Sequence, residues 1–159
     1  MTPRIGHGID AYRFIPGRPL MLGGVLIPYD RGLLGHSDGD AVVHALVDAI
    51  LGAASLGDMG KHFPSSDPRW KDTSGCEFLH VVAERLREEG WMIASAHVVA
   101  IAEEPRLAGH LAAMSDAMSK ALGLERGTIA VGATTTDGMG FSGRSEGIAA
   151  SATVLLERR

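Results

Sequence analysis

The spacing of apolar positions along the chain predicts three helices. Apolar residues recur every three or four positions over residues 39–54, which is the period of a helix with one buried face. Ser37 or Asp38 can serve as the N-cap of this helix. The same spacing predicts helices over residues 74–89 and 107–122, and each of these is followed by a glycine that suits a helix end.

Shorter apolar segments predict strands. Residues 4–9 and 20–27 flank the dipeptide Pro16-Gly17, so we expect them to pair as a hairpin. Residues 91–102, 128–134 and 147–156 complete the strands. A chain of 159 residues is of single-domain size. The element order therefore predicts one α+β domain over residues 1–159, with a mixed sheet and helices packed on one face.

Charge and composition narrow the class of ligand and the location. The net charge of −4 argues against a nucleic-acid partner, because that binding depends on Lys and Arg at the phosphates. Any anionic ligand therefore needs local cations or a metal. The single cysteine, Cys76, cannot form an internal disulfide and fits the cytoplasm. The most apolar stretch, residues 45–56, is interrupted by Asp48, so we expect no membrane span and no targeting segment.

Polar residues gather in three segments at predicted element ends, residues 8–12, 36–44 and 134–144. Asp10 and Tyr12 share one face if the first strand extends that far, because strand side chains alternate. His44 lies on the first predicted helix, and Asp48 one turn later could accept a hydrogen bond from its second ring nitrogen. That arrangement is typical of a metal-bound imidazole.

Each of these residues also has a purely structural explanation. Asp10 could be a turn or cap residue, and His44 could be a hydrogen-bonded core histidine. The threonines at 134–136 could form a strand edge. Asp38 and Asp40 could simply interact with the helix dipole. The residues taken singly leave these alternatives open.

Taken together and in order, the motifs resemble the 2-C-methyl-D-erythritol 2,4-cyclodiphosphate synthase family of the non-mevalonate isoprenoid pathway. The resemblance covers almost the whole chain. Its most specific part is the His-Ser-Asp-Gly-Asp run that precedes His44. The segments that carry it are RIGHGID at 4–10, GLLGHSDGDAVVHAL at 32–46, LGDMGKHFP at 56–64, ATTTD at 133–137 and GFSGRSEGIA at 140–149.

The resemblance implies a phosphorus-oxygen lyase. Such an enzyme closes the 2-phosphate of 4-diphosphocytidyl-2-C-methyl-D-erythritol 2-phosphate onto its own β-phosphate and releases CMP. By the same resemblance, Asp10 and His44 hold Zn²⁺ or another divalent cation. Asp137 serves a second ion, Mg²⁺ or Mn²⁺, bound with the substrate diphosphate.

The remaining roles carry over position by position. The catalytic positions of the family correspond to His36 and Thr135. The positions that hold the methylerythritol portion correspond to Ser37, Asp58, Gly60, Phe63 and Asp67. The cytidine and phosphate segment corresponds to residues 102–108, with Ala102, Arg106, Leu107 and Ala108. Thr134, Thr136, Phe141 and Arg144 complete the substrate site, to which Asp10, Tyr12 and Asp137 also belong.

The resemblance further implies a homotrimer whose active sites lie between neighbouring subunits. The metal-binding residues and the cytidine segment of one site then come from different chains. Arg144 and Glu146 correspond to the pair that lines a central cavity on the trimer axis, where an isoprenoid diphosphate could bind.

Four positions depart from the family pattern. Tyr12 stands where a histidine is usual, and a neutral phenol is a poorer zinc ligand than imidazole. Zinc affinity should fall, or water should fill the third position. Asp137 replaces a glutamate, Gly132 a lysine and Ser65 an aspartate. These changes leave two alternatives: a catalytically weak relative that binds nucleotides or isoprenoid diphosphates, and a metal-dependent phosphohydrolase that forms a linear product.

Overall fold

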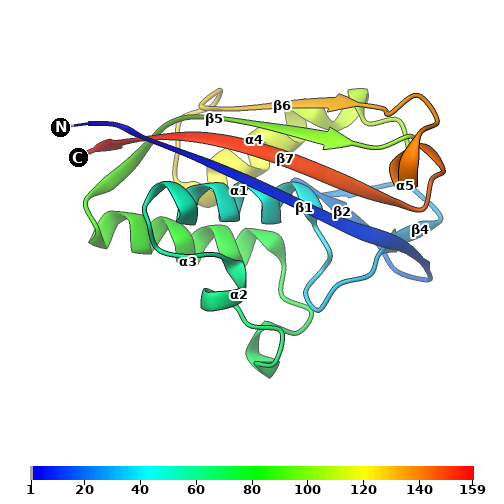
Figure 1. The fold of residues 1–159 in the computed structure, drawn as a ribbon, viewed down its shortest axis with the longest axis horizontal. Helices are drawn as coiled ribbons and strands as arrows, with labels where there is room; N and C mark the ends of the chain where they lie inside the picture. Colours follow the sequence, from blue (N-terminus) through cyan, green and yellow to red (C-terminus); the bar gives the residue numbers. More distant parts are fainter. Residues whose placement is uncertain (1) are drawn as a thin grey trace.

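The computed structural model describes residues 2–159, which form a mixed sheet with its long helices on one face (Figure 1). The five strands run in the order β4-β1-β7-β5-β6. Only β5 and β6 pair in parallel. The single α+β domain with a mixed sheet is therefore confirmed. The strands are β1 (Arg4–Pro16), β4 (Arg31–Leu33), β5 (Trp91–Ile101), β6 (Ile129–Thr134) and β7 (Gly147–Arg158).

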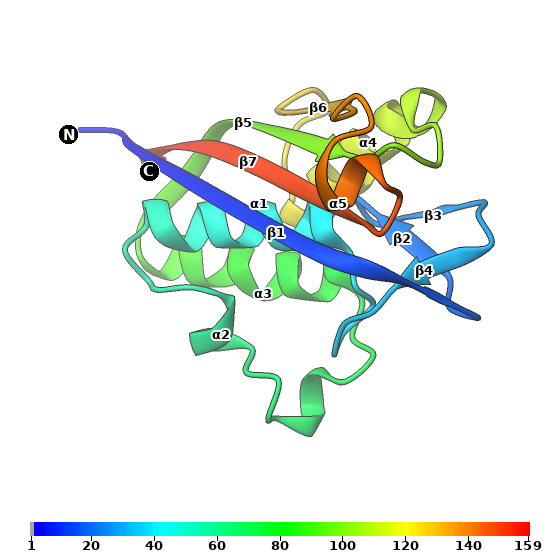
Figure 2. The ribbon, with the colours of Figure 1, turned by 45° about the vertical axis from the view of Figure 1, so that its right-hand side comes forward.

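The three predicted helices are present with shorter bounds. They are α1 (Ala41–Ala53), α3 (Gly75–Glu88) and α4 (Leu111–Leu122). Helix α1 lies against β1 and β7, α4 against β6, and α3 packs on both helices. The short elements are α2 (Met59–His62), α5 (Gly140–Gly143) and the 3₁₀ turns η1 (Pro68–Trp70) and η2 (Ala108–His110). Figure 2 shows α2 and the segment after it beyond α3, on the side away from the sheet.

Two details of the helix starts differ from the sequence prediction. The N-cap of α1 is Asp40, whose carboxylate accepts a hydrogen bond from the Val43 amide, and neither Ser37 nor Asp38 has that role. The first turn predicted for the third helix is the separate 3₁₀ turn η2. Helix termini are the least reliable part of a periodicity argument, because a cap is defined by backbone geometry and not by apolar spacing.

Two glycines allow α1 to approach the sheet closely. A Cβ on Gly6 would lie 1.9 Å from the Ala49 carbonyl oxygen, and one on Gly8 would lie 2.2 Å from that of Ala45. Both distances are far inside van der Waals contact, so β1 contacts the backbone of α1 directly. This contact determines how closely the side chains of α1 approach β1.

The predicted hairpin between residues 4–9 and 20–27 is wrong. Strand β1 pairs with β7 over its length and with β4 at its end. Residues 20–27 form their own hairpin of β2 (Leu20–Leu22) and β3 (Val25–Ile27), which turns at Gly23 and Gly24 with φ of 59° and 76°. Local sequence does not encode the partner of a strand, and β1 finds a longer partner, β7, at the other end of the chain.

The sheet face opposite the helices is open in the single chain. Ile5 is 74% exposed and Ile9 is 65% exposed there, and exposed His7, Thr153 and His97 lie side by side across β1, β7 and β5. Within residues 2–159, no helix has the length and apolarity needed to cross a membrane.

Candidate active site

The imidazole of His44 is the centre of the first cluster. Its side chain is 1% exposed, and both ring nitrogens have polar neighbours. Nδ1 shares a hydrogen bond of 2.9 Å with the Tyr12 hydroxyl and lies 3.5 Å from Asp10 Oδ2. Nε2 shares a hydrogen bond of 3.1 Å with Ser37 Oγ and lies 3.9 Å from Asp38 Oδ1. The prediction that Asp10 and Tyr12 share a strand face is confirmed.

The N-terminus of α1 is held by a fully buried carboxylate. Asp40 Oδ1 accepts hydrogen bonds from the amides of Gly23 and Val43, and Oδ2 accepts one from Gly24. Burial raises the pKa of this carboxyl group above its ordinary value. Asp40 thereby ties the β2–β3 turn to the helix that carries His44.

The predicted hydrogen bond between His44 and Asp48 is wrong. Asp48 Oδ1 instead accepts a hydrogen bond of 2.8 Å from the Met59 amide at the start of α2. Helical side chains lean toward the helix N-terminus. His44 therefore turns toward Ser37 and β1, away from the residue one turn further along.

The Asp10 and His44 pair fits part of a metal site. Two ligands at about 2.0–2.1 Å from one tetrahedral zinc ion lie about 3.3 Å apart, close to the observed 3.5 Å between Oδ2 and Nδ1. The third position of such a site would fall to Tyr12. Burial and the Asp10 carboxylate raise the pKa of its phenol above the ordinary value, so the hydroxyl is neutral in the metal-free protein and is a weaker zinc ligand than an imidazole. Among residues 2–159, no group of three His, Cys, Asp or Glu side chains could hold a metal ion.

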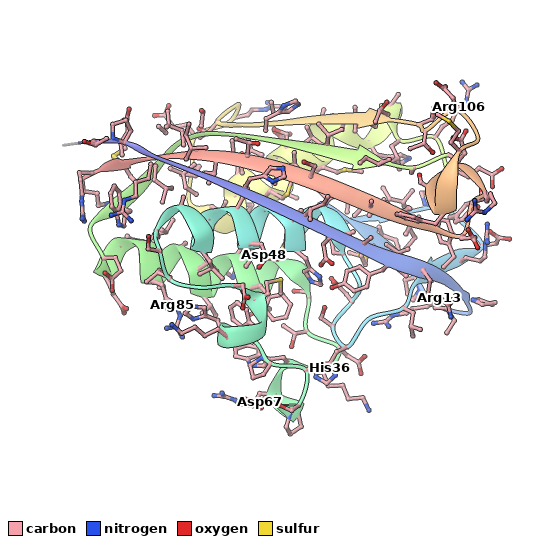
Figure 3. All side chains as sticks on the ribbon, in the orientation of Figure 1. Arg13, His36, Asp48, Asp67, Arg85 and Arg106 are labelled. Carbon is pink, nitrogen blue, oxygen red and sulfur yellow. The ribbon has the colours of Figure 1, made fainter. Side chains whose placement is uncertain are left out.

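His36 faces the loop that follows α2. Its Nε2 lies 3.3 Å from the Asp67 carbonyl oxygen, and Figure 3 shows the two residues close together below β1. The Asp67 carboxylate accepts hydrogen bonds from Arg69 Nε and Nη2 at 2.9 and 2.8 Å. The Arg69 guanidinium lowers the pKa of Asp67, which is therefore an ion-paired carboxylate.

Three of the other residues predicted to hold the methylerythritol portion lie on α2 or at its ends, whereas Ser37 lies in the loop before α1. Asp58 is the N-cap of α2, and Gly60 lies within that helix. Phe63 is only 6% exposed. Its ring centroid lies 4.6 Å from that of Phe78, which in turn lies 5.5 Å from His44. This aromatic packing links the segment to the His44 cluster.

A second cluster lies where β5 and β6 end. A pocket of about 250 Å³ is lined there by Ala102, Arg106, Leu107, Ala108, Thr134 and Thr135, together with Glu103, Pro105 and Ala133. The structure thus brings together the residues predicted for cytidine and phosphate binding. Figure 3 shows Arg106 across the sheet from His36. Within one chain, therefore, His36 and the cytidine segment around Arg106 lie apart.

The loop between β6 and β7 carries the remaining predicted residues. Thr135 Oγ1 donates a hydrogen bond of 3.3 Å to Asp137, whose backbone φ is 53°. Arg144 and Glu146 form an exposed ion pair with an Nη2 to Oε2 distance of 2.8 Å. Thr136 and Phe141 line an apolar depression together with Ile9, Asp10, Ala11, Ile101, Met139, Gly140, Ser142 and Ala149.

Two acidic residues have contacts that the sequence did not reveal. Asp38 Oδ2 accepts a hydrogen bond of 2.9 Å from Gly75 N, so this residue ties the start of α3 to the His44 cluster. Glu103 accepts one of 3.1 Å from Gly138 N and so joins the second pocket to the β6–β7 loop. Asp38 carried a sequence signal, since it lies within the acidic run before α1. Glu103 lies within the predicted cytidine segment 102–108, but its contact with Gly138 joins residues far apart in the sequence and follows no local pattern.

The comparisons with known proteins agree with this fold. The YgbB family model matches residues 3–157. The 2-C-methyl-D-erythritol 2,4-cyclodiphosphate synthase of Moorella thermoacetica is 52% identical, over 96% of this chain and 94% of its own. The chain belongs to the YgbB family, and it is an enzyme of the phosphorus-oxygen lyase class.

Two solved structures superpose along almost the whole chain. The bifunctional IspDF of Campylobacter jejuni matches 99% of this chain with a TM-score of 0.95 and 39% identity, and the match spans 43% of that longer protein. A 2C-methyl-D-erythritol-2,4-cyclodiphosphate synthase in its CDP-bound form matches 97% of this chain and 100% of its own, with a TM-score of 0.88 and 39% identity.

Proposed function

We propose that this enzyme converts 4-diphosphocytidyl-2-C-methyl-D-erythritol 2-phosphate to 2-C-methyl-D-erythritol 2,4-cyclodiphosphate and CMP. An oxygen of the 2-phosphate attacks the β-phosphorus, and the bond from that phosphorus to the CMP oxygen breaks. The nucleophile belongs to the substrate, so no covalent enzyme intermediate is needed. The protein must fold a flexible polyanion and offset its charge. The observation that carries this proposal is the spacing of Asp10 and His44 on facing elements, which suits a bound cation.

The charges around His44 support a role for cations in binding the substrate. Asp10 and Asp38 both lie within 4 Å of its ring nitrogens. If no cation were bound, these carboxylates would repel a diphosphate from the cluster. We propose that Asp10 and His44 hold Zn²⁺, and that Asp137 holds Mg²⁺ or Mn²⁺ with the substrate. Bound there, such ions supply Lewis acidity and neutralise charge on the diphosphate.

The protein groups would then orient the substrate around these ions. His36 and Thr135 would position the phosphates for in-line attack. Ser37, Asp58, Gly60, Phe63 and Asp67 would hold the methylerythritol portion. Residues 102–108 would hold the cytidine through backbone groups, and their grouping with Thr134 and Thr135 in one pocket supports this role.

We propose that the enzyme assembles as a homotrimer with each active site between two chains. Two observations support this. The exposed Ile5 and Ile9 lie on the sheet face that the long helices leave uncovered, and large exposed apolar patches mark protein interfaces. The His36 and Arg106 halves of the site are also separated within one chain (Figure 3). Arg144 and Glu146 would then bind an isoprenoid diphosphate on the trimer axis. The one free thiol, Cys76, supports a cytoplasmic location.

Phosphorus-31 NMR of the reaction mixture tests the proposed reaction. Purified enzyme is incubated with the substrate, Zn²⁺ and Mg²⁺, and a parallel sample contains a chelator. We expect the signals of a cyclic diphosphate and CMP in the first sample only. A linear product would indicate a phosphohydrolase, and substrate binding without CMP release would indicate a binding protein. Either result contradicts the proposal.

A further inference from the structure

Arg18 reaches from the turn after β1 to the loop that carries His36. Its Nη1 donates a hydrogen bond of 2.8 Å to the Gly35 carbonyl oxygen, and its Nη2 donates one to the Ser37 carbonyl oxygen. The side chain is 23% exposed, and Nη2 also lies 4.0 Å from Asp72 Oδ1. One guanidinium therefore binds the carbonyls on both sides of His36.

The carbonyl between these two is held by the segment that contains Asp67. The Asp72 amide donates a hydrogen bond of 2.9 Å to the His36 carbonyl oxygen. Residues 34–40 belong to no helix or strand, so they have no ladder of backbone hydrogen bonds. Three consecutive carbonyls in this loop are instead fixed by Arg18 and Asp72. The backbone that carries the His36 and Ser37 side chains is thereby held in one conformation.

The base of the Arg18 side chain is itself held in place. A Cβ on Gly32 of β4 would lie 2.5 Å from the carbonyl oxygens of both Arg18 and Pro19, so the arginine backbone packs directly on that strand. A planar guanidinium offers several donors in a rigid fork, whereas a lysine ammonium is a compact point charge. Only arginine can bind both carbonyls from this position in fixed geometry.

We propose that Arg18 is a positioning residue for the ring closure. Arg18 fixes His36 and Ser37 relative to His44, which Ser37 Oγ contacts. Through Asp72, Arg18 also couples these residues to the segment that contains Asp67. Arg18 does not touch the reacting atoms in this account. The proposal rests on the proposed function, because the role of His36 is part of that function.

Kinetics of Arg18→Ala and Arg18→Lys test this role. We expect kcat to fall roughly 10- to 100-fold in both variants, as misplacement of reacting groups produces, with a smaller change in KM. Added guanidinium ion should restore part of the lost kcat of Arg18→Ala in a saturable way. Arg158→Ala is the matched control, because Arg158 Nη1 donates a similar bond of 2.7 Å to the Glu89 carbonyl oxygen elsewhere. Its kcat should stay unchanged with or without guanidinium.

Amide hydrogen exchange provides a test that does not depend on turnover. The Asp72 amide should exchange faster in Arg18→Ala than in the unmodified enzyme, and Arg18→Lys provides the same test if the alanine variant does not fold. If the unmodified enzyme formed no cyclic product, only the proposed function would be refuted. Hydrogen exchange of the Asp72 amide would still test whether Arg18 holds the loop. Unchanged kcat and unchanged Asp72 exchange in Arg18→Ala, with an active unmodified enzyme, would overturn the role of Arg18.

Discussion

The Tyr12 hydroxyl lies 2.9 Å from His44 Nδ1, the same ring nitrogen that faces Asp10 Oδ2 at 3.5 Å. A cation bound between Asp10 and His44 needs the lone pair of that nitrogen, so the hydrogen bond between Tyr12 and His44 must break when the cation binds, whichever of the two groups donates in it. Tyr12 therefore weakens the proposed site in two ways: it supplies a poor ligand, and it occupies the nitrogen of a good one.

The variant Tyr12→His should bind zinc more tightly, because an imidazole replaces a neutral phenol beside Asp10. We expect a gain of roughly tenfold or more, the scale of affinity changes around metal-bound imidazoles. Competition with a chromophoric chelator measures it. Tyr12→Phe is the control, since it removes the hydroxyl without adding a ligand. Equal zinc affinity in Tyr12→His and Tyr12→Phe would show that position 12 does not face the ion.

The variant His44→Ala should lose both bound zinc and CMP release, because the imidazole is the one nitrogen ligand of the proposed site. Elemental analysis of protein purified without chelator and a CMP assay measure the two losses. His80→Ala, which changes an exposed histidine of α3, should change neither. If His44→Ala retained its metal content and its turnover, the assignment of His44 would be wrong.

The variant Gly8→Ala should be strongly destabilised, because its Cβ would lie 2.2 Å from the Ala45 carbonyl oxygen. We expect a loss of about 3 kcal/mol in the free energy of unfolding, the upper range for overpacking. Gly52→Ala in α1 has no neighbour within 4 Å of the new Cβ, so it should gain about 0.5–1 kcal/mol. Urea denaturation measures both. A stable Gly8→Ala variant would contradict the direct contact of β1 with α1.

The variant Asp40→Ala should lose about 3 kcal/mol or more, because three amides, two of them in the β2–β3 turn, lose their acceptor. Ser74→Ala is the control. Ser74 caps α3 through a single bond of 3.3 Å to the Glu77 amide, so its loss should cost only about 1 kcal/mol. Thermal unfolding compares the two variants. Similar losses would show that Asp40 is an ordinary cap.

The variant Ile9→Glu should dissociate the proposed trimer, since it buries a carboxylate in the apolar contact between chains. Sedimentation velocity should show the mass of three chains for the unmodified enzyme and of one chain for the variant. His80→Glu adds the same charge on α3 and should leave the assembly intact. A monomeric unmodified enzyme would contradict the proposed assembly.

The sequence predicted the helices and the fold class well, because apolar spacing records which face of an element is buried. It also placed Asp10 and Tyr12 on one face of β1, since that follows from strand alternation alone. It failed on the partner of residues 20–27. Strand β1 pairs instead with β7 at the other end of the chain, where Arg4 faces Leu156 and Arg13 faces Gly147, and a local pattern carries no record of that partner.

Local sequence also does not encode the side-chain contacts at the site. His44 was identified correctly as a central residue, but its neighbours depend on side-chain direction, which turned it toward Ser37 and away from Asp48. The contacts of Arg18 with the His36 loop join segments that are apart in sequence and follow no period. Such contacts can be found only once the fold has brought the segments together.

Anomalous X-ray scattering from a crystal soaked in zinc tests the central claim most directly. The account predicts one zinc peak about 2.0–2.2 Å from both an Asp10 carboxylate oxygen and His44 Nδ1, with the Tyr12 hydroxyl moved off that nitrogen. A crystal with no peak there, and with the Tyr12 and His44 hydrogen bond intact, would contradict it.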